Sequence, residues 1–512
     1  MKSFQRIKNI HGKDYLYSIT PYYDKESKKI RQKSRYIAPV KDGKVVEKTV
    51  VTYTYGDLIP VMKAVRELRL HEILSRISGE HAETVLVMAL NRVIRPEAMN
   101  NIQPWYEDSY ISTVYGADVT SSALSGIMET IGKTNPNHSF LKEIIPVAGE
   151  NSAFYYDLTS FSSHSLDMAF LEYGYSRSDP ELPQVNVSMV ETASGIPLFY
   201  DIYPGSVVDV TTVMNTVAVL KAAGISSMRM IMDRGMFSSR NIEYLLSENV
   251  DFIMPASFTM KQVKAMALLS RKVMERGSNM IQVNDEIMFA MKRSLDIGDM
   301  KVGCFVYYDP GRDSRERSSF YSSLHSRVET LRNRKARTWE KPSDIVDEVM
   351  SGYRNFISWR YSDGFILKMK ENAISQRVNR CGITIIAFTG DHDACEILDE
   401  YRKRDSVEKM FMASKSFTGA EPLRVHSLET LRGELFVNLI ALAIRSRILR
   451  EMRDSGLMKK YSVEKMLLEL QKIRKVILQD GKEIMTEVTK RQKEILEKLS
   501  VPLDHVPTFL KS

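Results

Sequence analysis

The clearest chemical signal in the sequence is a set of four polar residues at fixed spacing: Tyr401, Arg404, Glu408 and Lys415. At about 100° per residue, helical geometry gathers all four into a sector roughly 60° wide on one helix face. A carboxylate beside a phenol, a guanidinium and an ammonium group can hold a metal ion next to a phosphodiester. The alternative is a solvated helix face on which Arg404 and Glu408 form an ordinary i,i+4 ion pair.

Two isolated aspartates upstream favour the chemical interpretation. Asp157 follows the apolar run 153–156, and Asp233 follows the run 228–232, so we expect each aspartate at the end of a strand. In an open α/β sheet, strand ends of this kind bound the functional crevice. Either aspartate alone could simply cap a helix or end a strand. Convergence of both with Glu408 across one sheet predicts a metal site.

The segments that must position these residues alternate between strand and helix patterns. Three antiparallel strands are predicted first, over residues 153–156, 184–190 and 196–203, with Gly195 at a turn. Helices and strands then alternate over 210–223, 228–232, 239–248 and 251–254. A strand over 382–388 and a helix opening at Asp393, with Glu396 completing a capping box, continue the scheme. This order is expected of an RNase H-like α/β sheet.

The remaining segments predict the domain organisation of an α/β protein. Residues 1–56 are expected to form a basic β-rich arm, residues 57–150 a helical DNA-binding or dimerisation domain, and residues 453–512 a C-terminal hairpin and helix. The RNase H-like catalytic core would comprise 151–256 and 383–452. Residues 257–382 would form an inserted β-containing subdomain, with strands at 281–289 and 301–308 and mostly helix over 315–350.

Composition excludes several classes of protein. The chain has 512 residues, 43% hydrophobic and 27% charged, and no run approaches the roughly 18 apolar residues of a membrane span. No apolar h-region follows Met1, so we expect a soluble cytoplasmic, nucleoid-associated protein without a membrane partner. Three widely spaced cysteines without a Cys-x-x-Cys pair indicate neither a disulfide framework nor a zinc site.

The charge distribution favours a polyanionic partner. The net charge is +8, and residues 1–50 hold 13 basic and 5 acidic residues, so the formal excess lies in the first tenth of the chain. The basic run from Lys25 to Arg35 lies among tyrosines, namely Tyr15, Tyr17, Tyr22, Tyr23 and Tyr36, a mixture suited to phosphate contacts and stacking. A basic, soluble β-hairpin arm without a nucleic-acid role is the alternative.

These residues together resemble a known family, the DDE transposases of bacterial and archaeal insertion sequences, in the insertion-sequence-four type. That type is marked by a Tyr-x2-Arg-x3-Glu-x6-Lys signature, which residues 401–415 keep at every spacing. Segment 154–161 is similar to the block of the first aspartate, and segment 232–238 with Asn241 to that of the second. Segment 174–184 is similar to one between them, but it lacks a His-Arg pair and receives no role.

The resemblance implies a reaction and a set of site residues. Asp157, Asp233 and Glu408 would be the catalytic acids and would hold two Mg²⁺ ions, with Mn²⁺ as a substitute. Water would cleave the transposon end, and the freed 3′-hydroxyl would then attack target DNA. The resemblance also implies that Tyr401, Arg404 and Lys415 contact terminal phosphates of double-stranded DNA, and that the chain is a homodimer in the DNA complex.

Two alternatives to a transposase stay open at this level. One is an RNase H-like nuclease or Holliday-junction resolvase that cuts without joining. The other is a catalytically inactive, DNA-binding derivative of a transposase.

Insertions of this family can also carry a tryptophan that stacks on a flipped base; we expect Trp339 and Trp359 to be core residues instead.

Overall fold

The computed structural model describes most of the chain: residues 4–10, 12–24, 29–41, 44–45, 50–149, 152–163, 168, 170–173, 182–207, 209–405, 427–478, 482–502, 506 and 509. Contacts divide it into two compact units. The first comprises Met1–Arg66, Met99–Leu124 and Glu451–Ser512, and the second comprises Glu67–Ala98 and Ser125–Arg450. The helices expected between residues 57 and 150 are present but divide between the units, and the domain boundaries drawn from the sequence stay predictions.

The first unit holds two separate sheets with short helices. Its elements are β1 (Phe4–Ile10), β2 (Lys13–Asp24), β3 (Lys29–Lys41), β4 (Lys44–Val45), β5 (Val50–Thr54), α1 (Leu58–Glu67), α4 (Ile102–Asp108), α5 (Ile111–Val114), α17 (Val463–Leu470), β17 (Arg474–Leu478), β18 (Glu483–Met485) and α18 (Lys490–Lys498). Strands β1 to β4 form the arm sheet. Strand β5, which lies within the expected arm, pairs instead with β17 of the C-terminal hairpin, Thr52 opposite Val476.

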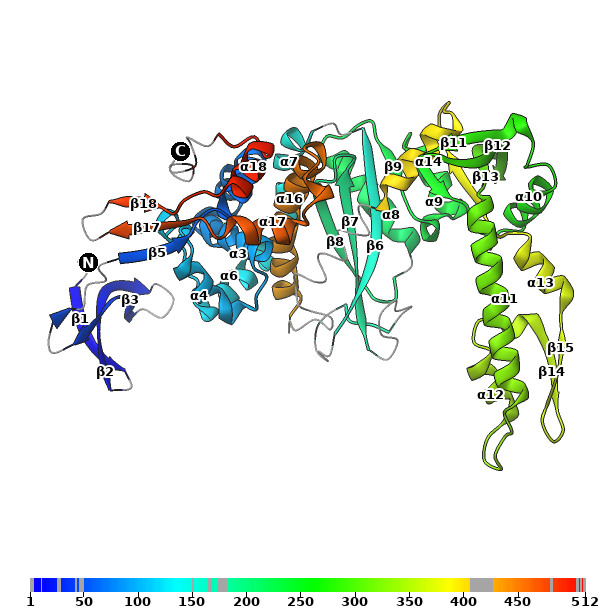
Figure 1. Cartoon of the computed structure of the whole chain (residues 1–512), viewed down its shortest axis with the longest axis horizontal. Coiled ribbons are helices and arrows are strands. Elements are labelled where there is room, and N and C mark those ends of the chain that lie inside the picture. Colours follow the sequence, from blue (N-terminus) through cyan, green and yellow to red (C-terminus); the bar gives the residue numbers. More distant parts are fainter. Residues whose placement is uncertain are drawn as a thin grey trace. The chain divides into compact units, whose positions relative to one another are not determined.

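The second unit is built on a nine-stranded mixed sheet flanked by helices (Figure 1). Its strands are β6 (Ala153–Ser162), β7 (Gln184–Thr192), β8 (Pro197–Pro204), β9 (Arg229–Ile231), β10 (Asp251–Pro255), β11 (Met280–Val283), β12 (Glu286–Ile297), β13 (Met300–Tyr308) and β16 (Ile383–Phe388). Its helices include α2 (Leu70–Ser78), α3 (Ala82–Ile94), α6 (Ser121–Thr134), α7 (Asn137–Ala148), α8 (Asp209–Ala222), α9 (Ser239–Ser247), α10 (Lys261–Arg271), α14 (Ala394–Lys403) and α16 (Leu428–Asp454).

The strand order is consistent with the predicted RNase H-like core. Strands run β11-β12-β13-β16-β10-β9-β6-β7-β8 across the sheet. Strands β6, β7 and β8 are antiparallel neighbours, whereas β9 lies parallel to both β6 and β10. The three strands of the expected insertion, β11 to β13, continue the same sheet through β16 and do not form a sheet of their own.

The rest of the expected insertion has its own apolar core. It consists of α11 (Pro310–Arg332), α12 (Pro342–Val349), the hairpin β14 (Ile357–Tyr361) and β15 (Phe365–Met369), and α13 (Glu371–Val378). Figure 1 shows α11 and α12 beside this hairpin. Phe320, Leu324, Val328 and Leu331 recur at helical spacing on α11 and bury one face of the helix in that core.

Four local predictions need correction. Residues 281–289 are not one strand, because Asn284 and Asp285 adopt positive φ and turn the chain between β11 and β12. Strand β6 continues through Asp157 to Ser162, so Asp157 lies within the strand and not at its end. Helix α14 ends at Lys403 with Arg404 as its C-cap, whereas the sequence predicts a helix continuing through Arg404 to Lys415; residues 406–426 lie outside the described residues.

The fourth correction concerns a tryptophan. Trp339, expected in the core, is 75% exposed, with the Arg337 guanidinium 5.6 Å from its ring centroid. Trp359 on β14 packs against the core of the insertion, as expected, and its ring lies 6.0 Å from that of Phe365.

Close approach of two helices gives the first testable prediction. A Cβ atom at Gly433 of α16 would collide with the main-chain carbonyl of Met128 on α6, whereas a Cβ at Gly126 of α6 would meet nothing within 4 Å. Gly433→Ala should therefore lower the free energy of unfolding by about 1 to 3 kcal/mol. Gly126→Ala should raise it by about 0.5 to 1 kcal/mol, because alanine favours the helix. Urea titration of both variants measures this; equal effects would show that the helix backbones are not in contact.

A buried acid in the first unit gives a prediction on pH. Burial raises the pKa of Asp57, whose side chain is almost fully enclosed before α1, to about 7. Between about pH 4 and 7 the folded state therefore keeps a proton that the unfolded state has lost, so stability should fall as pH rises through this window. Asp57→Asn should remove the fall and be the more stable protein at pH 8. Hydrogen exchange of the α1 amides measures it, with Asp14→Asn as an exposed control; an unchanged pH profile would contradict the assignment.

Candidate active site

The two aspartates singled out by the sequence come from neighbouring parallel strands, with Asp157 inside β6 and Asp233 just beyond the end of β9. Strands β6 and β9 pair Ala153 with Arg229, Phe154 with Met230 and Tyr155 with Ile231. Continuing this register by two residues places Asp157 opposite Asp233, which follows Met232 beyond β9 and is the N-cap of a short 3-10 helix, Arg234–Met236. The sheet therefore brings together two carboxylates that are far apart in the sequence.

Strand alternation decides which face of the sheet Asp157 occupies. Side chains of a strand point to opposite faces in turn, so Asp157 shares a face with Tyr155. The Tyr155 hydroxyl donates to the main-chain carbonyl of Glu400 on α14, 3.3 Å away. Tyr156, on the opposite face, donates to Thr212 of α8 at 2.6 Å. Asp157 thus faces α14, the helix that carries Tyr401.

A single guanidinium lies between the two carboxylates. Arg404 Nη1 is 3.5 Å from Asp157 Oδ1, and Arg404 Nη2 is 3.6 Å from Asp233 Oδ1. Arg404 and Asp157 are both buried, so their charges are weakly screened by solvent. The Tyr401 ring lies 5.7 Å from the same guanidinium, and burial raises the pKa of the Tyr401 phenol, which keeps the hydroxyl protonated.

Helix α14 is fixed at both ends, which positions Arg404. The Asp393 side chain accepts from the amides of Cys395 and Glu396 in the predicted capping box. Near the other end, Arg229 of β9 forms an ion pair with Glu400 at 3.0 Å. Because β9 also leads into Asp233, the same strand orients the aspartate and the helix that carries Arg404.

A buried asparagine shapes the chain after Asp233. Asn241 of α9 is fully buried, and its Nδ2 donates to the Met236 carbonyl at 2.8 Å. Its main-chain amide donates to the hydroxyl of the N-cap Ser238. Asn241 therefore fixes the turn that bears Asp233. This gives a structural reason for the presence of an asparagine in the segment that is similar to a transposase block.

The remaining predicted site residues cannot be placed. Glu408 and Lys415 lie outside the described residues, as does most of segment 174–184, and so do the side chains of the basic run from Lys25 to Arg35. Within the described residues, no group of three or more histidine, cysteine, aspartate or glutamate side chains could hold a metal ion. Asp157 and Asp233 nevertheless fit a divalent cation, because both are hard oxygen ligands and already share one cationic neighbour.

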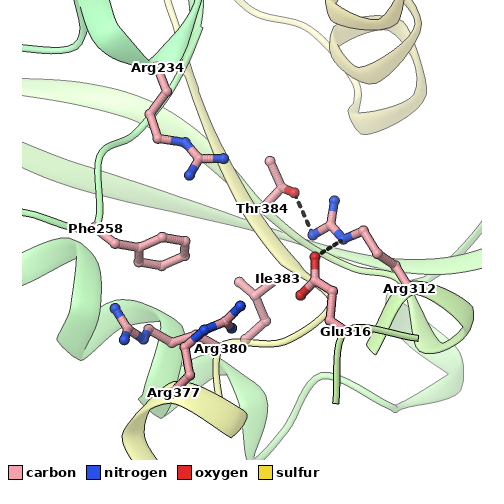
Figure 2. A pocket seen from close by; sticks show the side chains of 8 residues that line it. All are labelled: Arg234, Phe258, Arg312, Glu316, Arg377, Arg380, Ile383 and Thr384. Carbon is pink, nitrogen blue, oxygen red and sulfur yellow. Dashed lines mark hydrogen bonds and ion pairs between the residues drawn. The ribbon is translucent and has the colours of Figure 1, made fainter. Parts of the chain in front are cut away.

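Sequence reasoning missed an arginine-rich cavity beside this site. The cavity, of about 360 Å³, is lined by Arg234, Phe258, Arg312, Glu316, Arg377, Arg380, Ile383 and Thr384 (Figure 2). Its arginines come from three separate segments, with Arg377 and Arg380 in the same one, and share no motif. Only Arg234, next to Asp233, fell within a segment that the sequence singled out.

Comparison with known families agrees with this site. Residues 183–444, which are 262 of the 512 residues, match the family model described as a transposase DDE domain. The chain therefore belongs to the DDE-domain transposases. Asp233, Arg404 and Glu408 fall within the matched range, whereas Asp157 precedes it. Among curated proteins, none matches the sequence.

Membership in this family has consequences for partners and cofactors. DDE transposases act on DNA and generally use divalent metal ions. Across the described residues, no helix is both long enough and apolar enough to cross a membrane.

The paired aspartates give a prediction on metal binding. Mg²⁺ or Mn²⁺ at a hundred times its dissociation constant should stabilise the folded protein by about 2.7 kcal/mol, because the ion binds only the folded state. Asp157→Asn and Asp233→Asn should each remove most of this gain, which thermal unfolding with and without metal measures. Asp363→Asn, which alters an almost fully exposed aspartate on the insertion, is the matched control and should keep the gain. A metal effect that survives in both site variants would place the ion elsewhere.

Proposed function

We propose that this protein is the transposase of an insertion sequence of the insertion-sequence-four type, which cleaves the ends of its element and joins the 3′-hydroxyl to target DNA. The observation that carries the proposal is the pair Asp157, within β6, and Asp233, just beyond the adjacent strand β9, which share the Arg404 guanidinium. The spacing from Tyr401 to Lys415 and the match to a transposase DDE domain support it.

The proposed roles follow from charge and burial. Asp157, Asp233 and Glu408 would hold two Mg²⁺ ions, for which Mn²⁺ could substitute; the bound metal supplies activation of the attacking oxygen and compensation of the leaving 3′-oxygen. Asp157 is buried and held by its strand, so its carboxylate is oriented before metal arrives. Asp233 is more exposed and lies on the open side of the site.

Arg404 and Tyr401 would bind the DNA end. While no metal is bound, Arg404 compensates the charge of Asp157 and Asp233. In the DNA complex this guanidinium would contact a phosphate near the cleaved bond, and the protonated Tyr401 hydroxyl would donate to the same group. We propose Lys415 as a third phosphate contact, on the basis of the signature alone.

The proposed reaction also sets the expected partners. Each transposition event joins two ends, so a homodimer on double-stranded DNA is the natural assembly. We propose the basic arm and the helical segments between residues 57 and 150 as the parts that bind DNA or the second protomer. The net charge of residues 1–50 supports this assignment.

Substitution of one aspartate tests the proposed chemistry. Asp157→Ala should reduce Mg²⁺-dependent cleavage of DNA that carries the flanking sequence of the reading frame by on the order of 10³-fold or more, while binding to that DNA is kept. Gel analysis of cleavage and a parallel binding titration measure both effects. Asp363→Ala, an exposed control on the insertion, should leave both unchanged. Loss of binding equal to loss of cleavage would contradict the assignment of Asp157 to a metal site.

A strand-transfer assay separates the alternatives. A pre-cleaved end with a free 3′-hydroxyl should give products longer than the input with the wild-type protein. Cleavage without longer products would instead indicate a nuclease or resolvase. Binding without cleavage under any metal condition would indicate an inactive derivative.

A further inference from the structure

The arginine-rich cavity of the second unit has an excess of positive charge. Arg312 forms an ion pair with Glu316 at 3.3 Å and donates to Thr384 at 2.7 Å (Figure 2). Glu316 also accepts from the main-chain amide of Gly382 at 3.0 Å, so its charge is compensated twice. Among the described residues that line the cavity, Glu316 is the only carboxylate and the arginines number four, so the lining carries an excess of positive charge.

Two of these four arginines, Arg377 and Arg380, are held in place by neutral contacts. Arg377 donates to the Cys381 sulfur at 3.3 Å, and Arg380 donates through Nε to the carbonyl of Gln376 at 3.0 Å. The Phe258 ring lies 5.6 Å from the Arg380 guanidinium. Within the part of the chain that the structure describes, Arg234, Arg377 and Arg380 form no ion pair.

The guanidinium groups destabilise one another in the absence of an anion. Burial, together with the neighbouring Arg377, lowers the pKa of Arg380. Like charges kept together at one cavity are costly unless a ligand compensates them. A phosphate group carries the complementary charge, and arginine binds it through two parallel hydrogen bonds.

The cavity lies at the same edge of the sheet as the aspartates. Arg234 directly follows Asp233, and Phe258 lies three residues beyond β10, whose carboxyl end is adjacent to that of β9. Ile383 and Thr384 begin β16, which runs antiparallel to β10. Arg312 and Arg377 come from α11 and α13 of the insertion. The cavity therefore joins the insertion to the aspartate edge, and its volume is in the range of known ligand sites.

We propose that this cavity binds a backbone phosphate of the DNA strand as the strand leaves the paired aspartates, with Arg234, Arg377 and Arg380 as the phosphate ligands. Phe258 acts as a positioning residue that orients Arg380. This inference rests on the proposed function, since it takes DNA at Asp157 and Asp233 as its starting point. In this proposal, the insertion contacts the DNA substrate directly.

Binding of a labelled duplex tests the proposal without catalysis. Fluorescence anisotropy with a fluorescein-labelled 20-bp duplex is measured in EDTA over a range of salt concentrations. The double variant Arg377→Gln/Arg380→Gln should bind about tenfold more weakly at low salt. Its salt dependence, as the slope of log K against log salt, should be shallower by about 1.8, or about 0.9 for each lost phosphate contact.

Matched variants guard against a general charge or folding effect. Arg332→Gln/Arg354→Gln removes two exposed arginines of the insertion that are paired with acids, and should leave affinity and slope nearly unchanged. Arg234→Gln alters an exposed residue on a different element, so it tests the cavity even if the double variant unfolds. It should lower the slope by about 0.9.

Each outcome of the binding experiment either supports or overturns the proposed phosphate site. Equal affinity and slope for the cavity variants and the wild type would overturn the proposal, as would equal losses in the Arg332→Gln/Arg354→Gln control. Displacement of the duplex by inorganic phosphate alone at low millimolar concentration would identify a small-anion site and would also overturn it. Failure of the proposed function is separate: Asp157→Ala would then leave cleavage intact, while the cavity variants could still lose binding.

Discussion

Two like charges held side by side, on Asp157 and Asp233, are the constraint on which the rest of this structure depends. The register of β6 with β9 brings the carboxylates together, and two adjacent carboxylates repel each other unless a cation lies between them or one of them takes up a proton. Arg404 supplies that cation in the structure, at 3.5 and 3.6 Å from the two carboxylates. Carboxylates that attract positive charge in this way can bind a divalent metal ion, and the arginine beside them can bind a phosphate group of the DNA.

The nine-stranded sheet explains how one edge can serve both chemistry and substrate binding. Strands β9 and β10 end at this edge, and β16 begins there. The inserted segment is part of the same sheet, because β13 pairs with β16 along its whole length. Residues of α11 and α13 line one cavity together with Arg234.

Much of the core could be predicted because its signals are local. Apolar runs, helix caps and the fixed spacing around Arg404 are readable within a few residues, and the capping box at Asp393 is present as expected. The continuation of β6 past Asp157 was missed because buried polar residues such as Ser160, which bonds Asn186 at 2.8 Å, interrupt the apolar pattern. Pairings such as β5 with β17, and the cavity of scattered arginines, depend on tertiary contacts that no local pattern encodes.

The most direct test of the account is anomalous diffraction from crystals of the full chain soaked in Mn²⁺. The account predicts an anomalous peak within about 2.5 Å of carboxylate oxygens from both Asp157 and Asp233, with the Arg404 guanidinium displaced from between them. Well-ordered aspartates that still bracket Arg404 at saturating Mn²⁺, or a peak ligated by neither of them, would contradict it.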